Sequence, residues 1–341
     1  MKQFKPSDRY LKIRTIDAHT EGEPFRVITS GVPVPEGNTI LEKRRYAKAH
    51  LDQFRKILMF EPRGHADMYG CFITEPVTKG ADFGVLFMHN EGFSTMCGHG
   101  IIAVTTIAVE TGLVPLKAPG QKIRIDTPAG PVTAVPNMKA NRVDSVTFEN
   151  VASFAPELDC RIDVPGLGPV TYDLGFGGAF YAFVHAEDLG LLCTPQYFSD
   201  LVDKGRRIKK AIMASKEIIH PFEKELSFLY GTIFVDFPGI ENVHSRHCCV
   251  FADGEIDRSP TGTGVSARLA VLKRRGQITT GERITINSII NTGFCGKIAG
   301  LSPLGPYEAV IPEITGRAFI TGIHEFLIDP DDPLGQGFIL R

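Results

Sequence analysis

Met96-Cys97-Gly98-His99-Gly100 and Pro260-Thr261-Gly262-Thr263-Gly264 are the two stretches that decide the fold of this 341-residue chain. In each, a polar residue is followed by Gly-x-Gly and then by a run with the composition of a helix. A helix start carries unpaired backbone N–H groups and a partial positive charge, so it favours anions such as a carboxylate or a thiolate. We therefore expect two equivalent helices, with the Cys97 thiol at the start of one and the Thr261 hydroxyl at the start of the other.

The two helical runs have the same length. The first covers 101–111 and is closed by Gly112, and the second covers 265–275 and is closed by Gly276. A glycine directly after a helix is a common stop signal, because it adopts the left-handed backbone conformation without strain. The first run is apolar nearly all round, which is typical of a helix buried inside a sheet.

The repeat extends upstream of these motifs and keeps its order. Three further pairs of segments match: 17–28 with 173–184, 40–58 with 197–213, and 68–73 with 229–234. The spacing between partners grows slowly along the chain, as a duplicated lobe with small loop insertions would produce. Two such lobes related by a pseudo-twofold axis would bring the two helix starts face to face across a cleft. Clefts between domains are a common place for small-molecule sites.

The sequence predicts an α+β fold of two pseudo-symmetric lobes, each a curled, mostly antiparallel sheet around a central helix. Many short runs of β-branched and aromatic residues are separated by Gly and Pro, and only four stretches have helical character. We expect a first lobe over 1–136 that carries the Cys97 motif and is completed by about 325–341. The second lobe, over 137–324, carries the Thr261 motif, and the chain is expected to cross between lobes near 137–143.

Composition narrows the class of protein. The net charge is −2 and hydrophobic residues make up 43%, which argues against a dedicated nucleic-acid or membrane surface. No apolar run reaches the length of a membrane span, and residues 1–10 lack the apolar core of a signal peptide. The seven cysteines are scattered without the spacing of a disulfide framework, which favours free thiols and a cytoplasmic setting.

Competing motifs are weak. The sequence has neither a Gly-x-Ser-x-Gly elbow nor a phosphate-binding Gly-x-x-x-x-Gly-Lys loop. His244, His247, Cys248 and Cys249 form a candidate metal cluster, but adjacent residues of a strand point to opposite faces of the sheet. We therefore expect packed cysteines there and no metal site.

The motifs resemble those of the proline racemase superfamily. The resemblance rests on 96–100 and 257–264, which are similar to the two signature segments, and on 17–24 and 61–65, which are similar to its N-terminal patterns. It runs from about Ile16 to Phe338 and implies the fold shared with diaminopimelate epimerase, without cofactor or metal. Racemases and hydroxyproline epimerases of the superfamily carry cysteine in both motifs. Thr261 in the second motif is the pattern of its trans-3-hydroxy-L-proline dehydratases.

Chemical reasoning from the residues leads to the same activity. A racemase needs a usable acid or base on each face of Cα, and a threonine hydroxyl is far too weak an acid for that role. A free thiol has a pKa of about 8.5, which a helix start is expected to lower. Dehydration of trans-3-hydroxyproline needs only one face, because the Cα hydrogen and the 3-hydroxyl are syn. Cys97 alone can then remove the Cα proton, which leads to Δ1-pyrroline-2-carboxylate.

Other site residues follow with their roles. We expect the N–H groups around Gly98-His99 and Gly262-Thr263 to hold the substrate carboxylate. Asp257 resembles the residue that binds the ring ammonium in the superfamily. His99 is either a group that orients this region or assists hydroxide departure, or a buried histidine bonded to backbone. Thr261 is either part of the catalytic pair or a helix cap that fills space.

Two alternatives remain open at this point. One is a proline racemase or 4-hydroxyproline 2-epimerase that uses Thr261 or a water on the second face. The other is a non-catalytic protein that binds imino acids, against which the intact Cys97 motif argues. The expected partner is a cyclic imino acid, with a homodimer as a further option.

Overall fold

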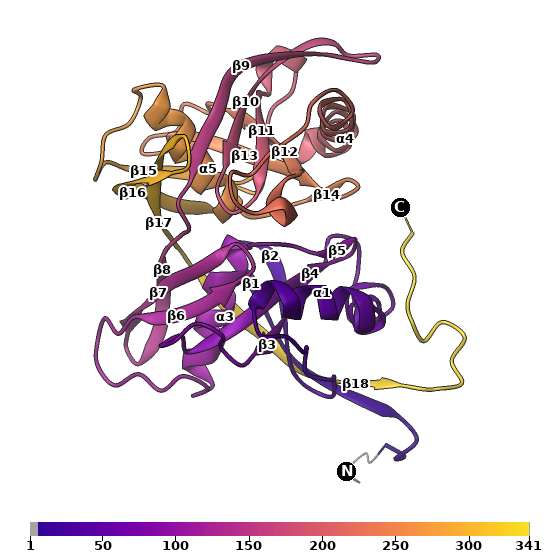
Figure 1. Ribbon diagram of the computed structural model, residues 1–341. Coiled ribbons are helices and arrows are strands. Elements are labelled where there is room, and N and C mark those ends of the chain that lie inside the picture. Colours follow the sequence, from indigo (N-terminus) through magenta and orange to yellow (C-terminus); the bar gives the residue numbers. More distant parts are fainter. Residues whose placement is uncertain (1–5, 341) are drawn as a thin grey trace.

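The computed structural model describes residues 6–340, and the lobe ends expected at 1–5 and 341 lie outside the described residues. Its sheet strands are arranged around two helices, α3 and α5, which start at the two motifs (Figure 1). The first group of elements comprises β1 (Leu11–Thr20), β2 (Glu23–Ser30), α1 (Ile40–His50), α2 (Asp52–Met59), β3 (Tyr69–Thr74), β4 (Phe83–His89), β5 (Gly92–Phe93), α3 (Gly98–Glu110), β6 (Ile123–Thr127), β7 (Gly130–Lys139) and β8 (Arg142–Glu149).

The second group repeats this order of strands after one additional strand at its start. It comprises β9 (Phe154–Val164), β10 (Gly168–Phe176), β11 (Phe180–His185), the 3-10 turns η1 (Glu187–Leu189) and η2 (Pro195–Tyr197), α4 (Phe198–Ser215), the 3-10 turn η3 (Lys224–Leu226), β12 (Leu229–Asp236), β13 (Ser245–Phe251), β14 (Glu255–Ile256), α5 (Gly262–Arg274), β15 (Arg283–Asn287), β16 (Gly293–Leu304) and β17 (Tyr307–Gly316). The last strand, β18 (Ala318–Ile328), returns to the first group and pairs with β1.

The strand pairings repeat between the two lobes. The first runs β18-β1-β2-β3-β4-β6-β7-β8 and the second runs β9-β10-β11-β12-β13-β15-β16-β17, with β5 on β4 and β14 on β13. Parallel pairs occur at equivalent places, β2–β3 with β11–β12 and β4–β6 with β13–β15; every other pairing is antiparallel. The two last strands, β8 and β17, pair with each other and join the sheets. This arrangement is the α+β fold of two pseudo-symmetric lobes that the sequence predicted.

Each sheet wraps one helix on its inner face and carries other helices outside. The inner cluster of apolar side chains surrounds α3 and α5 together, and both helices are buried over almost their whole length. A second cluster lies between the second sheet and α4, and a third lies between the first sheet and α1–α2. The repeated segment 40–58 forms two helices, α1 and α2, because the chain leaves helical geometry at Leu51 (φ −119°, ψ 7°).

The segment 137–143, expected to cross between the lobes, is instead a hairpin. Ala140 and Asn141 have φ of 49° and 61°, the signs that a two-residue turn between antiparallel strands requires, and β7 pairs with β8 on either side. A division at 136/137 would therefore cut strand β7. The pairings place the crossings near 150, between β8 and β9, and near 317, where β18 begins.

Candidate active site

The starts of α3 and α5 touch at the centre of the molecule. A Cβ built on Gly98 would lie 2.6 Å from the Gly262 Cα, and one built on Gly262 would lie 2.8 Å from the Gly98 Cα. Only glycine allows this approach, so both Gly-x-Gly motifs have a packing reason as well as a chemical one. The first N–H groups of a helix have no partner within that helix, so the two ends together form one site for an anion.

The seven residues predicted for the site line one cavity between these helix starts. They are Cys97, Gly98, His99, Asp257, Thr261, Gly262 and Thr263. The structure therefore brings them together, and their individual roles stay predictions. Six further residues line the cavity and received no role in the sequence analysis: Met96, Tyr69, Tyr181, Tyr230, Cys249 and Phe251.

Cys97 caps helix α3 with its sulfur. The Gly100 N–H donates to the Cys97 Sγ at 3.2 Å, and the His99 Nδ1 lies 3.3 Å from the same sulfur. Burial raises the pKa of the thiol well above its ordinary value, and the Gly100 N–H lowers it by a smaller amount. The expected lowering by the helix start is thus present, but desolvation outweighs it, because the side chain is only 3% exposed.

His99 is neutral in this environment. Burial lowers its pKa to about 4, against a smaller opposing effect of Asp257, whose Oδ2 is 4.0 Å from the Nδ1. Its backbone carbonyl accepts a hydrogen bond from the Thr20 hydroxyl, and its ring packs edge-on against Phe25 and Tyr69. His99 is therefore both a buried, packed histidine and a direct neighbour of the thiol.

Thr261 differs from Cys97 in backbone and in hydrogen bonding. Its φ is 65°, a left-handed value that is rare for a β-branched residue, whereas Cys97 has φ of −146°. The Thr261 hydroxyl does not cap α5 and instead donates to the Asp257 Oδ2 at 2.8 Å. The Ser259 N–H donates to the other oxygen of Asp257 at 2.7 Å. Thr261 is therefore the N-cap residue of α5 by position, without a side-chain cap bond, and its hydroxyl binds a carboxyl group instead.

A second buried carboxyl lies behind Asp257. Glu23, on β2, accepts a hydrogen bond from the Arg258 N–H at 2.6 Å and so ties the first lobe to the second. Burial raises the pKa of Glu23 well above its ordinary value, and the negative charge of Asp257 adds to the shift. Burial thus favours the neutral form of Glu23, and Asp257 is the carboxyl group of the pair that lines the cavity.

Two tyrosines from equivalent strands close one side of the cavity. Tyr69 on β3 and Tyr230 on β12 meet hydroxyl to hydroxyl at 3.1 Å, and Tyr69 also bonds the Ser94 hydroxyl at 2.5 Å. Within the second lobe, the Tyr181 hydroxyl forms a hydrogen bond with Thr263 Oγ1 at 2.6 Å. The sequence repeat contained Tyr69 and Tyr230 in matching segments, and that match was the signal that could have identified them.

The candidate metal residues do not converge. Cys248 packs in the cluster under α4, whereas Cys249 lies in the inner cluster and lines the cavity between the helix starts. The two thiols thus point to opposite faces of β13, as alternation along a strand requires. Within residues 6–340, no three His, Cys, Asp or Glu side chains are grouped as metal ligands would be. Within the same residues, no helix is both long and apolar enough to cross a membrane.

Comparison with known proteins gives the family. The sequence pattern of the proline racemase family matches residues 15–339. A protein of Colwellia psychrerythraea named trans-3-hydroxy-L-proline dehydratase is 47% identical, over 100% of this chain and 97% of its own. A protein of Burkholderia multivorans named 3-hydroxyproline 2-epimerase is 43% identical, over 96% and 98%.

A solved structure shows the same fold. The hydroxyproline epimerase of Agrobacterium vitis, determined with bound trans-4-hydroxy-L-proline, superposes with a TM-score of 0.92 at 34% identity. The similarity covers 98% of this chain and 96% of that one. Sequence pattern, full-length relatives and fold agree, and the chain belongs to the proline racemase family.

Proposed function

We propose that this protein is a trans-3-hydroxy-L-proline dehydratase that uses one thiol, Cys97, and no cofactor. The observation that carries the proposal is the asymmetry between the two helix starts. One presents a thiol to the cavity, and the other presents a hydroxyl that is already bonded to Asp257. Relatives that are 42–48% identical and share the dehydratase name support it.

Substrate binding follows from the charges around the cavity. The substrate carboxylate lies against the N–H groups of Gly98, His99, Gly262 and Thr263, at the positive ends of both helices. The ring ammonium lies against Asp257, whose carboxylate is held in position by Ser259 and Thr261. These two contacts place Cα between the helix starts, with its hydrogen toward Cys97.

The ring ammonium of the bound substrate also lowers the pKa of the Cys97 thiol. Burial disfavours the ionised form of the Cys97 thiol, and the nearby Asp257 adds to this effect. A substrate cation between them offsets this cost, because an opposite charge within a few ångström favours the ionised form. Neutral His99, whose Nδ1 lies 3.3 Å from the sulfur, is close enough to share a hydrogen bond with Cys97 and so to orient it.

The elimination then proceeds on one face of the ring. The thiolate takes the Cα proton, the Cα–H electron pair becomes the C2–C3 double bond, and the C3–O bond breaks. The hydroxyl leaves on the same face and takes the proton from the Cys97 thiol, so that water departs and the thiolate is restored. The enamine product tautomerises to Δ1-pyrroline-2-carboxylate. Hydrogen bonds from the helix ends stabilise the charge that builds on the carboxylate during proton removal.

The second candidate function is a 2-epimerase, which the similarity to the Burkholderia multivorans protein favours. Epimerisation requires a proton donor on the Thr261 side. The Thr261 hydroxyl is held by Asp257, and its proton is far less acidic than that of a thiol.

A cytoplasmic setting and a homodimer stay predictions.

The test uses three substrates and one variant. Purified protein is incubated with trans-3-hydroxy-L-proline, trans-4-hydroxy-L-proline and L-proline, and the cyclic imine and optical rotation are followed. We expect imine from the first substrate alone, and a loss of about 10²–10⁴-fold in Cys97→Ser, whose hydroxyl is a poor base. No imine from trans-3-hydroxy-L-proline, or near-normal turnover of Cys97→Ser, would contradict the proposal.

A further inference from the structure

The cavity between the helix starts is narrow in this structure. Its volume is about 20 Å³, which is room for roughly one water molecule, whereas a substituted five-membered ring needs several times more. Tyr69 and Tyr230, one from each lobe, close one side of it with their hydroxyl contact. A ligand of that size therefore fits only if the cavity widens.

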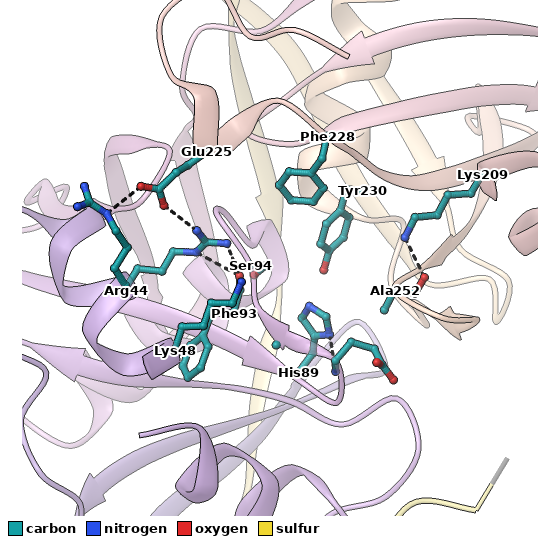
Figure 2. Close-up of a pocket in the computed structure, with 13 residues that line it drawn as sticks. Arg44, Lys48, His89, Phe93, Ser94, Lys209, Glu225, Phe228, Tyr230 and Ala252 are labelled. Carbon is teal, nitrogen blue, oxygen red and sulfur yellow. Dashed lines mark hydrogen bonds and ion pairs between the residues drawn. The ribbon is translucent and has the colours of Figure 1, made fainter. Parts of the chain in front are cut away.

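A second, much larger cavity adjoins this one at Tyr230. Its volume is about 650 Å³, and Tyr230 lines both cavities. Ser94, the hydrogen-bond partner of Tyr69, also lines it. Figure 2 shows residues of both lobes around this space, with Phe228 and Tyr230 above and His89 and Phe93 below. We call it the outer chamber.

The outer chamber has an excess of positive charge. Four basic side chains line it, Arg44, Arg45 and Lys48 from α1 and Lys209 from α4, against two acidic ones, Glu91 and Glu225. The Lys209 ammonium donates to the Ala252 carbonyl at 2.8 Å, and the Arg44 guanidinium donates to the Phe93 carbonyl at 2.7 and 3.1 Å. These contacts fix the cations at the wall of the chamber.

Glu225 ties the two lobes together across the chamber. One of its oxygens lies 3.1 Å from Arg44 Nη1 (Figure 2). The other lies 2.9 Å from Arg45 Nε. Glu225 belongs to the second lobe and both arginines belong to the first. A carboxylate from the protein thus occupies the place between two guanidinium groups where a carboxylate from a ligand would bind.

We propose that the outer chamber is the entrance to the catalytic cavity, and that Arg44 and Arg45 form a docking site for the carboxylate of the incoming ligand. The ligand carboxylate replaces Glu225 on the two guanidinium groups, which removes a tie between the lobes. The lobes part at Tyr69 and Tyr230, and the ligand passes to the helix starts. The site takes small monocarboxylates, and the amino-acid class of the substrate rests on the proposed function.

The experiment measures access to Cys97 and needs no turnover. The rate of alkylation of Cys97 is followed by peptide mass spectrometry with two reagents of similar size, anionic iodoacetate and neutral iodoacetamide. The iodoacetamide rate reports how often the cavity opens. The ratio of the iodoacetate rate to the iodoacetamide rate reports capture of a carboxylate.

Two variants and one control test the two parts of the proposal separately. The parts are capture of the carboxylate by Arg44 and Arg45, and opening of the cavity when Glu225 is displaced. In the double variant Arg44→Gln/Arg45→Gln the ratio should fall about 5- to 10-fold, as loss of electrostatic steering predicts. In Glu225→Gln both rates should rise several-fold, and the ratio should rise because the arginines are uncovered. Lys210→Gln removes an exposed charge on α4 that does not line the chamber, and it should change neither value.

An unchanged ratio in the arginine double variant, or an unchanged iodoacetamide rate in Glu225→Gln, would overturn the proposal. Arg44→Lys/Arg45→Lys keeps both charges and should retain most of the ratio, which guards against a variant that merely folds poorly. If the wild-type protein fails to dehydrate trans-3-hydroxy-L-proline but shows these alkylation rates, the entrance stands and the proposed function falls.

Discussion

Two effects act on the pKa of the Cys97 thiol in opposite directions. Burial raises the pKa, and the hydrogen bond from the Gly100 N–H lowers it by a smaller amount. The reactive form is the thiolate, so a raised pKa leaves only a small fraction of it near neutral pH, and that fraction grows tenfold with each pH unit until the pKa is reached. We therefore expect kcat/KM for trans-3-hydroxy-L-proline to rise steadily between pH 7 and pH 9. A profile that is flat over this range would mean that the thiol is already ionised in the free enzyme.

Thr261 is the residue whose chemistry separates this protein from an enzyme with two thiols. Its left-handed backbone carries a cost of about 1–3 kcal/mol, and the hydrogen bond to Asp257 is the contact that this conformation makes possible. We infer that Thr261 positions the carboxylate that binds the ring ammonium. Its substitution should then act on substrate binding more than on the chemical step.

Thr261→Val and Thr261→Ser test this role as a matched pair. Valine keeps the shape and removes the hydroxyl, so KM should rise about 10-fold, the value of one hydrogen bond to a charged group, with a smaller change in kcat. Serine keeps the hydroxyl, and its steady-state constants should stay close to those of the wild type. Equal effects in the two variants, or a loss confined to kcat, would assign Thr261 a different role.

At the scale of elements, the site depends on how closely α3 and α5 approach. Gly98→Ala would place a methyl group 2.6 Å from the Gly262 Cα, so the helix starts have to separate. Because displacements of about 1 Å can cost 10²-fold in rate, we expect kcat to fall by about that factor. Gly112→Ala is the control at the other end of α3: its φ is 74° and no atom would lie within 4 Å of the new Cβ.

Gly112→Ala should lower the free energy of unfolding and leave kcat unchanged. An alanine in a left-handed conformation costs about 1–2 kcal/mol, which denaturant unfolding measures directly. Gly98→Ala should instead show its main effect in kcat. If both variants lose stability alone, the contact between the helix starts serves folding and not catalysis.

The same elements show what the sequence could predict. The motif helices were predictable because their starts and their closing glycines repeat, and local signals of this kind determine helix ends. The break between α1 and α2 at Leu51 was not predictable, because residues 40–58 contain neither proline nor glycine to mark it. The hairpin at 137–143 was not predictable either, because Ala140 is an uncommon residue for a turn that needs positive φ.

At the scale of the whole molecule, the pseudo-twofold arrangement explains which parts of the site were missed. Equivalent residues of the two lobes meet near the axis: Gly98 with Gly262, Tyr69 with Tyr230, and strand β8 with β17. The sequence repeat predicted that such pairs exist. Which pairs touch depends on how the sheets curl, and that information is not local to any segment. Tyr69 and Tyr230 therefore appeared as matching strand residues, and their contact became evident only in the structure.

The central claim is that only the Cys97 side of the cavity exchanges protons with substrate. The most direct measurement incubates the wild-type protein with L-proline and with trans-4-hydroxy-L-proline in deuterium oxide, and follows the C2 position by NMR and chiral chromatography. We predict that little or no C2 epimer forms, and that any deuterium at Cα enters with retention, because Cys97 returns a solvent deuteron to the face from which it took the proton. Efficient formation of the deuterated C2 epimer would contradict the account and assign a working acid to the Thr261 side.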